Sequence, residues 1–188
     1  LVQQFYNTRR KQLLSNEIRA NNAHFALAKL EQQFDGDFLL VTQNIDNLHE
    51  ESGSNNVLHM HGELLKMRCS FTGQIFEIFE AITSTMCCEC CGKTGSLRPH
   101  IVWFGELPFH MPRIENALSQ CDLFLSIGTS GQVYPAAGFV QQANKSNAHT
   151  IEVNIEPSVT ESVFDEHLYG KAGTILPRFV DIFLSKNG

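Results

Sequence analysis

Residues 43–63, QNIDNLHEESGSNNVLHMHGE, decide how the rest of the chain is interpreted. The stretch opens with the polar residues QNID at 43–46, directly after an apolar run, and a Gly/Ser/Asn-rich loop follows. A second short apolar run, Val57–Met60, then leads into His61 and Gly62. Polar side chains placed where short strands end are typical of the binding crevice of an α/β protein. We therefore expect a ligand site around these residues.

The segments on either side of this stretch alternate between helix-like and strand-like patterns. In residues 1–34 the apolar side chains recur at helical spacing, whereas FLLVT at 38–42 is a continuous apolar run, as in a parallel strand buried on both faces. This alternation predicts a Rossmann-like, doubly wound parallel α/β sheet. Pro177 falls at the start of the last expected helix, where proline is tolerated. The other expected strands are 57–60, 101–104, 123–127 and 150–155, and the other expected helices are 114–119, 134–143 and 176–184.

We expect a single domain over residues 1–188 with three parts. These are a helical segment at 1–34, a cysteine-rich insertion at 67–97, and a Rossmann-like part at 35–66 and 98–188. The first residue is Leu rather than an initiator Met, and it already lies within a helical pattern. We therefore expect the chain to be incomplete at its N-terminus.

The charge and hydropathy of the chain argue against two classes of partner. The formal net charge is −6 and the sequence contains no run of Lys and Arg, which disfavours nucleic acid as a partner, and with it a zinc-ribbon nucleic-acid binder. No window approaches the roughly 18 consecutive apolar residues that span a membrane. The start of the chain also has no secretory signal pattern. We expect a cytoplasmic protein with no membrane partner.

The cysteines predict a metal site. Cys88 and Cys91 form a C-x2-C pair, and Cys69 begins a second such pair in which Thr72 occupies the place of the second cysteine. This is the spacing of a structural zinc ribbon with one of its four ligands replaced. Either of two further cysteines could supply the missing thiolate, namely Cys87 or Cys90. The alternative is a group of free thiols, or a degenerate site that no longer holds zinc.

Two other strand ends carry residues suited to a nucleotide. Gly128, Thr129 and Ser130 follow an apolar run, and such a turn lets the backbone approach a phosphate. An ordinary strand-to-helix turn would look the same. Asn154 and Glu156, after the next strand, suit ribose hydroxyls, although a helix cap followed by proline is an equally good interpretation.

Three histidines lie close together in the sequence, His49, His59 and His61. A histidine in a strand is more often structural than catalytic. His61 is the best candidate for a general base, because it ends a strand and because an imidazole titrates near neutral pH.

Taken together, these segments resemble a known family. QNID, HMHGE at 59–63, the cysteine-bearing insertion, RPHIVWFGE at 98–106, GTSGQVYPAA at 128–137 and VNIEP at 153–157 occur in the order found in sirtuins. Sirtuins are NAD-dependent protein-lysine deacylases. The resemblance covers essentially the whole chain and is closest to bacterial CobB-type members, which group with the desuccinylases.

The resemblance implies a role for each motif. His61 would be the catalytic base, and the nicotinamide and ribose pocket would be lined by Gln43, Asn44, Ile45 and Asp46. The rest of the NAD co-substrate would be bound by Gly128, Thr129, Ser130, Asn154, Ile155, Glu156 and Ala172. The acyl-lysine peptide would lie between Val102, Trp103, Phe104, Gly105 and Glu106 on one side and Val133, Tyr134 and Pro135 on the other. One structural zinc would be held by Cys69, Cys88, Cys91 and either Cys87 or Cys90.

The resemblance also implies the reaction. The acyl oxygen attacks C1′ of the nicotinamide ribose and expels nicotinamide, and His61 then deprotonates a ribose hydroxyl. The deprotonated ribose then lets the 2′-oxygen attack the resulting imidate, and water releases free lysine and O-acyl-ADP-ribose. The partners would be proteins or peptides that carry acetyl-, succinyl- or malonyl-lysine, and we expect a monomer.

Tyr6 and Arg9 have two interpretations. Three residues apart on a helix, they share a face. From the residues alone, an aromatic core residue beside a surface arginine is favoured, with Arg10 and Lys11 at the surface as well. The resemblance instead implies that Tyr6 and Arg9 bind the carboxylate of succinyl- or malonyl-lysine, because a guanidinium matches a carboxylate.

The sequence departs from the family at two places. Thr72 replaces a usual zinc ligand, and nothing matches the Gly-rich phosphate loop and cofactor-binding segment with which sirtuins begin. We therefore expect this chain to bind NAD weakly and to turn over slowly. The competing hypothesis is a non-catalytic, zinc-stabilised module that binds acyl-lysine peptides.

Overall fold

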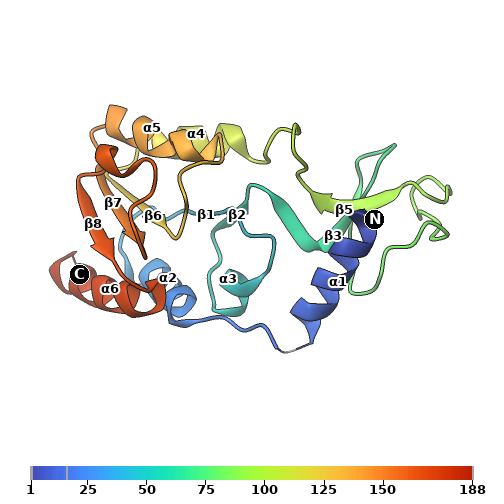
Figure 1. The fold of residues 1–188 in the computed structure, drawn as a ribbon, viewed down its shortest axis with the longest axis horizontal. Coiled ribbons are helices and arrows are strands. Elements are labelled where there is room, and N and C mark those ends of the chain that lie inside the picture. The colour runs from blue at the N-terminus through green and yellow to red at the C-terminus, as the bar shows by residue number, and fades with distance from the viewer. Residues whose placement is uncertain (1, 16, 188) are drawn as a thin grey trace. The chain divides into compact units, whose positions relative to one another are not determined.

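The structure, a computed structural model, describes residues 2–15 and 17–187 (Figure 1). Residues 1 and 16 of the expected helical segment, and residue 188, lie outside the described residues. The chain divides into two compact units. The first comprises Leu1–Arg19, Leu40–Glu51 and Val57–His110, and the second comprises Ala20–Leu39, Ser52–Asn56 and Met111–Gly188.

The second unit is built on a three-stranded parallel sheet. Its strands are β6 (Leu123–Ile127), β7 (His149–Asn154) and β8 (Glu166–Tyr169), hydrogen-bonded in that order. Helices α4 and α5 cover the sheet on one side in Figure 1, and α2 and α6 pack together on the other. The helical elements are α2 (Asn22–Gln33), α4 (Met111–Leu118), α5 (Phe139–Lys145), α6 (Ala172–Asn187) and the 3-10 turns η1 (Ala136–Gly138) and η2 (Glu161–Val163).

Helix α2 shows how the sequence specifies this unit. Asn21 caps its N-terminus, because the side chain accepts a hydrogen bond from the Ala23 backbone N–H at 2.8 Å. The His24 ring in turn accepts one from the Asn21 N–H at 3.2 Å, which completes a capping box. The buried face then repeats at helical spacing through Ala23, Ala26, Leu27 and Leu30.

The first unit holds two separate sheets. Strands β1 (Leu40–Thr42) and β2 (Val57–His59) pair in parallel. Strand β3 (Gly62–Cys69) pairs antiparallel with both β4 (Ile75–Glu77) and β5 (Leu97–Ile101). Two helices complete the unit, α1 (Val2–Leu14) and α3 (Leu48–Glu51). Among the described residues, the parallel pairing that the sequence predicted occurs in β1–β2 and in β6–β7–β8, whereas β3, β4 and β5 pair antiparallel.

Gly62 allows β3 and β5 to approach each other beside His61. Its backbone has a φ of 91°, and a Cβ placed on it would lie 2.0 Å from the carbonyl oxygen of His100. No other residue fits there without moving β5. The group that approaches Gly62 is therefore the backbone of β5.

Several expected element boundaries were wrong. The strand expected at 101–104 is β5, which ends at Ile101, and 102–106 is a loop. The helix expected from residue 134 begins as η1 at Ala136 and as α5 only at Phe139. Helix α6 begins at Ala172, so Pro177 lies inside it rather than at its start. Strands β3 and β8 were not expected, because neither is a continuous apolar run.

Arg10 was expected at the surface and is buried, with 1% of its area exposed. Its Nε donates to the Leu64 carbonyl at 2.9 Å, and its Nη1 donates to the Glu80 carbonyl at 3.2 Å and to Asn7 Oδ1 at 2.9 Å. These hydrogen bonds offset much of the cost of burying the charge, although the buried Nη2 has no partner among the described residues. Arg10 therefore fixes α1 against β3 and the residues that follow β4, which composition alone does not indicate.

Candidate functional site

His61 lies between β2 and β3, and its ring is oriented by the backbone. Its Nδ1 is 3.1 Å from the carbonyl oxygen of Gln43. Because a carbonyl oxygen can only accept, Nδ1 must carry the hydrogen and Nε2 is left as the acceptor of the neutral ring. His61 as a whole is half-buried. A neutral imidazole held in this tautomer has the free ring nitrogen that a general base needs.

The QNID segment, which follows β1, is fixed at several points. The Asn44 N–H donates to the Thr42 hydroxyl at 3.1 Å, and the Ile45 carbonyl accepts from the Leu64 N–H at 2.7 Å. Asp46 accepts from the Leu48 N–H at 3.2 Å and so holds the start of α3. The polar side chains that the sequence singled out therefore sit on a defined backbone beside His61.

His59, which the sequence analysis left without a role, anchors the same segment. Its Nε2 is 2.6 Å from Glu50 Oε1, and its Nδ1 is 3.4 Å from the Asn44 carbonyl oxygen. Both partners only accept, so the ring makes both hydrogen bonds when both of its nitrogens carry hydrogen, as in the imidazolium form. Burial lowers the pKa of His59, but the hydrogen bond to Glu50 and the charges of Glu50 and Glu63 outweigh it and raise the pKa above 6.5.

The His59–Glu50 pair makes stability depend on pH. Burial raises the pKa of Glu50, but the hydrogen bond from His59, a backbone hydrogen bond and the charges of His59 and His49 together outweigh it and lower the pKa below 4.5. Stability from His59 is fully present below pH 6.5 and is lost as pH rises through its folded pKa; that from Glu50 is present above pH 4.5 and is lost as pH falls through its folded pKa. The pair should therefore contribute most between these values.

We expect urea titrations from pH 4 to 9 to show this window. The contribution should be about 1 kcal/mol, because Glu50 is partly exposed. A His59→Gln variant should lose the decline above the window. Since His149 is an exposed histidine beside two carboxylates, His149→Gln is the matched control. A decline that persists unchanged in His59→Gln would assign it to another group.

In the second unit, hydrogen bonds connect the expected nucleotide-binding residues at the end of β6 with those at the end of β7. The Asn154 side chain donates to the Thr129 carbonyl at 2.8 Å, and the Gly128 N–H donates to the Val153 carbonyl at 2.9 Å. The helix-cap interpretation of Asn154 is wrong, because the next helical turn in the described chain begins only at Glu161. The side chains that remain most open are Ser130, Ile155 and Glu156.

The loop at 102–106 is held by its own glutamate. Glu106 accepts from Arg98 Nη1 at 2.6 Å and Nη2 at 3.0 Å, and from the Trp103 N–H at 2.9 Å. The hydrogen bonds from Arg98 lower the pKa of Glu106 to about 2. The Arg98 guanidinium also lies 3.4 Å over the Trp103 ring, while Phe104 is fully exposed. Sequence reasoning missed Arg98, because no spacing rule links it to Glu106.

The other expected substrate residues are accessible. On α1, Arg9 is exposed with its Cζ 5.4 Å over the Phe5 ring, and Tyr6 is half-buried with its ring against the edge of Phe5. In the second unit, Val133 and Tyr134 are exposed before η1. Ala172 is the first residue of α6.

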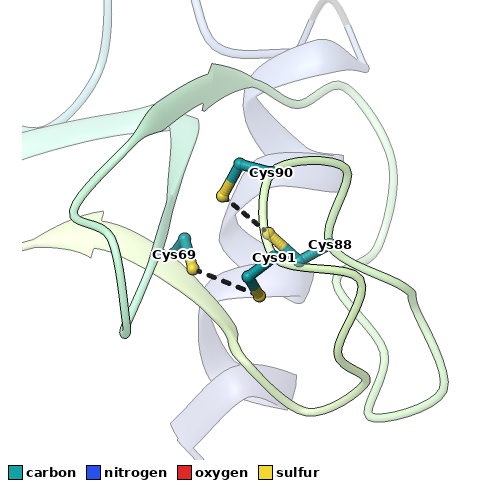
Figure 2. A group of neighbouring side chains, drawn as sticks. All are labelled: Cys69, Cys88, Cys90 and Cys91. Carbon is teal, nitrogen blue, oxygen red and sulfur yellow. Dashed lines mark hydrogen bonds between the residues drawn. The ribbon is translucent and has the colours of Figure 1, made fainter.

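Four cysteines converge in the insertion (Figure 2). The sulfur atoms of Cys69, Cys88, Cys90 and Cys91 all lie within 4.8 Å of one another. The Cys69–Cys91 and Cys88–Cys90 sulfur pairs are 3.7 and 3.2 Å apart. With zinc–sulfur bonds of about 2.3 Å, the sulfurs of a regular tetrahedron are about 3.8 Å apart, so the set fits zinc. Cys87, one of the two candidates for the fourth ligand, is exposed and outside the cluster.

Two similar backbone turns present these sulfurs. The Gly73 N–H donates to the Cys69 carbonyl at 2.9 Å, and the Gly92 N–H donates to the Cys88 carbonyl at 2.8 Å. Thr72 therefore stands where Cys91 stands in the other turn, and its hydroxyl is 3.0 Å from the Cys90 sulfur. The Cys90 thiol therefore lies beside Thr72, at the position where the turn closed by Gly73 has no cysteine.

The thiols influence each other's protonation. A hydrogen bond from Thr72 lowers the pKa of Cys69 to about 6. Thr72 also lowers the pKa of Cys90, but burial and the neighbouring sulfurs of Cys88 and Cys69 outweigh this and raise it to about 11. Crowded sulfurs of this kind resist carrying several negative charges together, and a bound cation removes that penalty.

The described part of the chain, residues 2–15 and 17–187, contains no helix both long and apolar enough to cross a membrane.

Comparison with known proteins gives consistent matches. The model of the Sir2 family matches residues 1–135. An NAD-dependent protein deacylase of Pasteurella multocida (strain Pm70) is 57% identical over 184 residues, which are 98% of this chain and 79% of that protein. A solved Sir2 homolog–NAD complex is 33% identical with a TM-score of 0.88, over 98% of this chain and 72% of that one. Sir2Af2 bound to a myristoylated histone peptide is 31% identical with a TM-score of 0.78, over 95% and 78%.

The family model covers well over half of the chain, and the Pasteurella relative is similar along almost all of it. These matches agree with the oriented His61, the QNID segment beside it and the four-cysteine cluster. The chain belongs to the Sir2 family.

Proposed function

We propose that this protein removes acyl groups from protein lysines with NAD as co-substrate, releasing nicotinamide, O-acyl-ADP-ribose and free lysine. The acyl groups are acetyl, succinyl and malonyl. Support comes from the relatives named NAD-dependent protein deacylase and from the solved NAD complex of a Sir2 homolog.

The observation that carries the proposal is the orientation of His61. With Nδ1 hydrogen-bonded to the Gln43 carbonyl, Nε2 is the nitrogen that accepts a proton from a ribose hydroxyl. The fixed backbone of the QNID segment supports a role for Gln43, Asn44, Ile45 and Asp46 in holding the nicotinamide end.

The remaining expected residues complete the proposed site. Gly128, Thr129 and Ser130 bind the phosphate and ribose region, and Asn154, Ile155, Glu156 and Ala172 hold the adenosine end. The peptide contacts Val102, Trp103, Phe104, Gly105 and Glu106, and also Val133 and Tyr134. The exposed apolar surface of Phe104 and Tyr134 supports a binding role for these segments.

The zinc in this proposal is structural. Cys69, Cys88, Cys90 and Cys91 hold it, and bound zinc supplies folding free energy rather than reaction chemistry. The insertion has only a small core around Ile78, Ile82 and Leu97, packed against two of these cysteines.

The direct test measures products from the purified chain with NAD and acetyl- or succinyl-lysine peptides, with mass spectrometry detecting both free lysine and O-acyl-ADP-ribose. Free lysine without O-acyl-ADP-ribose would contradict the proposal. Calorimetric titration with NAD tests the expected weak binding. The cytoplasmic location and the monomeric state stay predictions, which cell fractionation and light scattering test.

Acyl preference provides a second prediction. Because Arg9 is exposed on α1, its guanidinium can pair with the carboxylate of succinyl-lysine. Tyr6 lies three residues earlier, on the same face of the helix. Arg9→Met should lower kcat/KM for a succinyl-lysine peptide about 10- to 100-fold and leave the acetyl-lysine peptide within about twofold. Lys11→Met, which removes an exposed cation from the same helix, is the control. An unchanged succinyl-to-acetyl ratio in Arg9→Met would remove this role from Arg9.

A further inference from the structure

A groove in the first unit is lined by basic side chains. It has a volume of about 600 Å³ and lies against β3, β4 and β5 and the residues after them. Arg68, Arg98, His100 and His110 line it together with Phe109. None of the described residues that line it is acidic. Cys69, one of the proposed zinc ligands, lies at the edge of this groove, whereas the proposed deacylation chemistry does not use it.

Two of these side chains form a like-charged pair across the sheet. Arg68 on β3 stands directly opposite Arg98 on β5 in the strand register. Like charges placed opposite each other destabilise an antiparallel pair unless a counter-charge is present. Glu106 supplies one, since its Oε2 is 3.0 Å from Arg98 Nη2 and 3.3 Å from Arg68 Nη2. One carboxylate thus serves two guanidinium groups, and one positive charge remains in excess.

The excess charge is concentrated on Arg68. Arg98 is the more fully bound of the two, with two hydrogen bonds to Glu106, a third to the Ile101 carbonyl at 3.1 Å, and the Trp103 ring beneath it. Only its buried Nε has no partner among the described residues. Arg68 makes a single long contact with Glu106 and is held over the Phe109 ring at 5.5 Å. A guanidinium has five N–H donors. Most of those on Arg68 therefore have no acceptor among the described residues, although the side chain is held in place.

We propose that this groove binds an acidic side chain, Asp or Glu, close to the acylated lysine of a protein substrate. The inference deepens the proposed deacylase function by naming a class of substrate, and it rests on that function. A planar guanidinium with free donors fits a carboxylate. Glu106, in the loop at 102–106, contacts both Arg98 and Arg68, and these two arginines line the groove. An acidic residue of a peptide bound at that loop would therefore come close to Arg68.

The size of the groove favours a peptide over a small anion. A volume of about 600 Å³ is many times that of a phosphate or acetate ion, and so large a groove cannot surround one with donors. The stacked rings of His100 and Phe109, 4.5 Å apart, provide an apolar surface for the stem of a side chain.

The test compares acyl-lysine peptides that differ only in Glu, Gln or Lys at the positions flanking the modified residue. The wild-type KM should be about tenfold lower with flanking Glu than with Gln, and highest with flanking Lys, because a charge-assisted hydrogen bond contributes that much. Arg68→Gln should remove the difference between Glu and Gln peptides without changing kcat for the Gln peptide. Arg68→Lys, which keeps the charge and loses the fork, should retain part of it.

A binding measurement separates this inference from the deacylase function. Fluorescence anisotropy with labelled Glu, Gln and Lys peptides, without NAD, reports the groove directly. If no peptide is deacylated but the Glu peptide binds about tenfold more tightly and Arg68→Gln abolishes the difference, the function fails and the groove assignment stands. If wild-type protein treats Glu and Gln peptides alike in both assays, the assignment fails. It also fails if inorganic phosphate displaces the Glu peptide at equal concentration. The comparison of the Glu, Gln and Lys peptides uses wild-type protein alone, so it tests the assignment even if the Arg68 variants do not fold.

Discussion

Replacing His61 by asparagine is expected to lower NAD-dependent deacylation about a thousandfold. The asparagine side chain keeps an N–H that can donate to the Gln43 carbonyl, as His61 Nδ1 does at 3.1 Å, but it has no nitrogen that accepts a proton. General-base catalysis contributes about 10²- to 10⁴-fold, so the loss should fall on kcat. The measurement is free-lysine formation at saturating acyl peptide and NAD.

Two controls isolate the role of the base. Proton abstraction by His61 follows the expulsion of nicotinamide in the proposed sequence, so exchange of labelled nicotinamide into NAD should survive in His61→Asn far better than deacylation does. His149→Asn, at an exposed histidine far along the sequence, should be fully active. Equal loss of exchange and deacylation in His61→Asn would show that His61 binds or positions the substrates rather than taking the proton.

Loss of zinc is expected to unfold the insertion. Its buried cluster consists of Cys69, Ile78, Ile82, Cys88 and Leu97, and two of these are proposed ligands. So small a core cannot offset the conformational entropy of the segment without a bound ion. A strong zinc chelator should therefore lower the free energy of unfolding by several kcal/mol, with loss of amide protection between residues 69 and 96.

The cysteine variants decide the ligand set. Cys90→Ser should lower zinc content and the Tm, whereas Cys87→Ser should change neither, because Cys87 is exposed outside the cluster. Since Thr72 occupies the place that matches Cys91 and lies 3.0 Å from the Cys90 sulfur, Thr72→Cys should restore zinc binding to Cys90→Ser. Zinc content is measured by plasma mass spectrometry and the Tm by thermal melts for each variant. Loss of zinc from Cys87→Ser together with full zinc in Cys90→Ser would reverse the assignment.

The sequence predicted best those features that have short-range signals. The apolar run before QNID became the parallel strand β1, and the helical spacing in residues 22–33 became α2. The C-x2-C spacing indicated the metal cluster but left the fourth ligand open. Cys87 and Cys90 are both plausible by spacing, and only the fold determines which of their side chains faces the cluster. The turn closed by Gly92 decides between them in three dimensions.

Features that depend on long-range partners could not be predicted. Strand β5 contains Pro99 and two charged or polar residues in five, so it does not look like a strand until β3 pairs with it. The roles of Arg10, Arg98 and His59 depend on carbonyls and carboxylates that lie far away in the sequence or in other elements. A single sequence gives no spacing that links such groups.

The burial of Arg10 has a consequence for its neighbour Arg9. Arg10 fastens α1 by two hydrogen bonds, to the Leu64 and Glu80 carbonyls, and makes a third to Asn7 within the helix. The helix that carries Arg9 is therefore already ordered before any acyl group arrives. A long side chain on a mobile loop would lose about 0.5–1.5 kcal/mol of conformational freedom on binding, besides the cost of ordering the loop itself. On α1 the backbone has already lost its conformational entropy during folding, so binding has to order only the side chain. Of the two adjacent arginines, Arg10 anchors the helix and Arg9 is thereby pre-organised for binding.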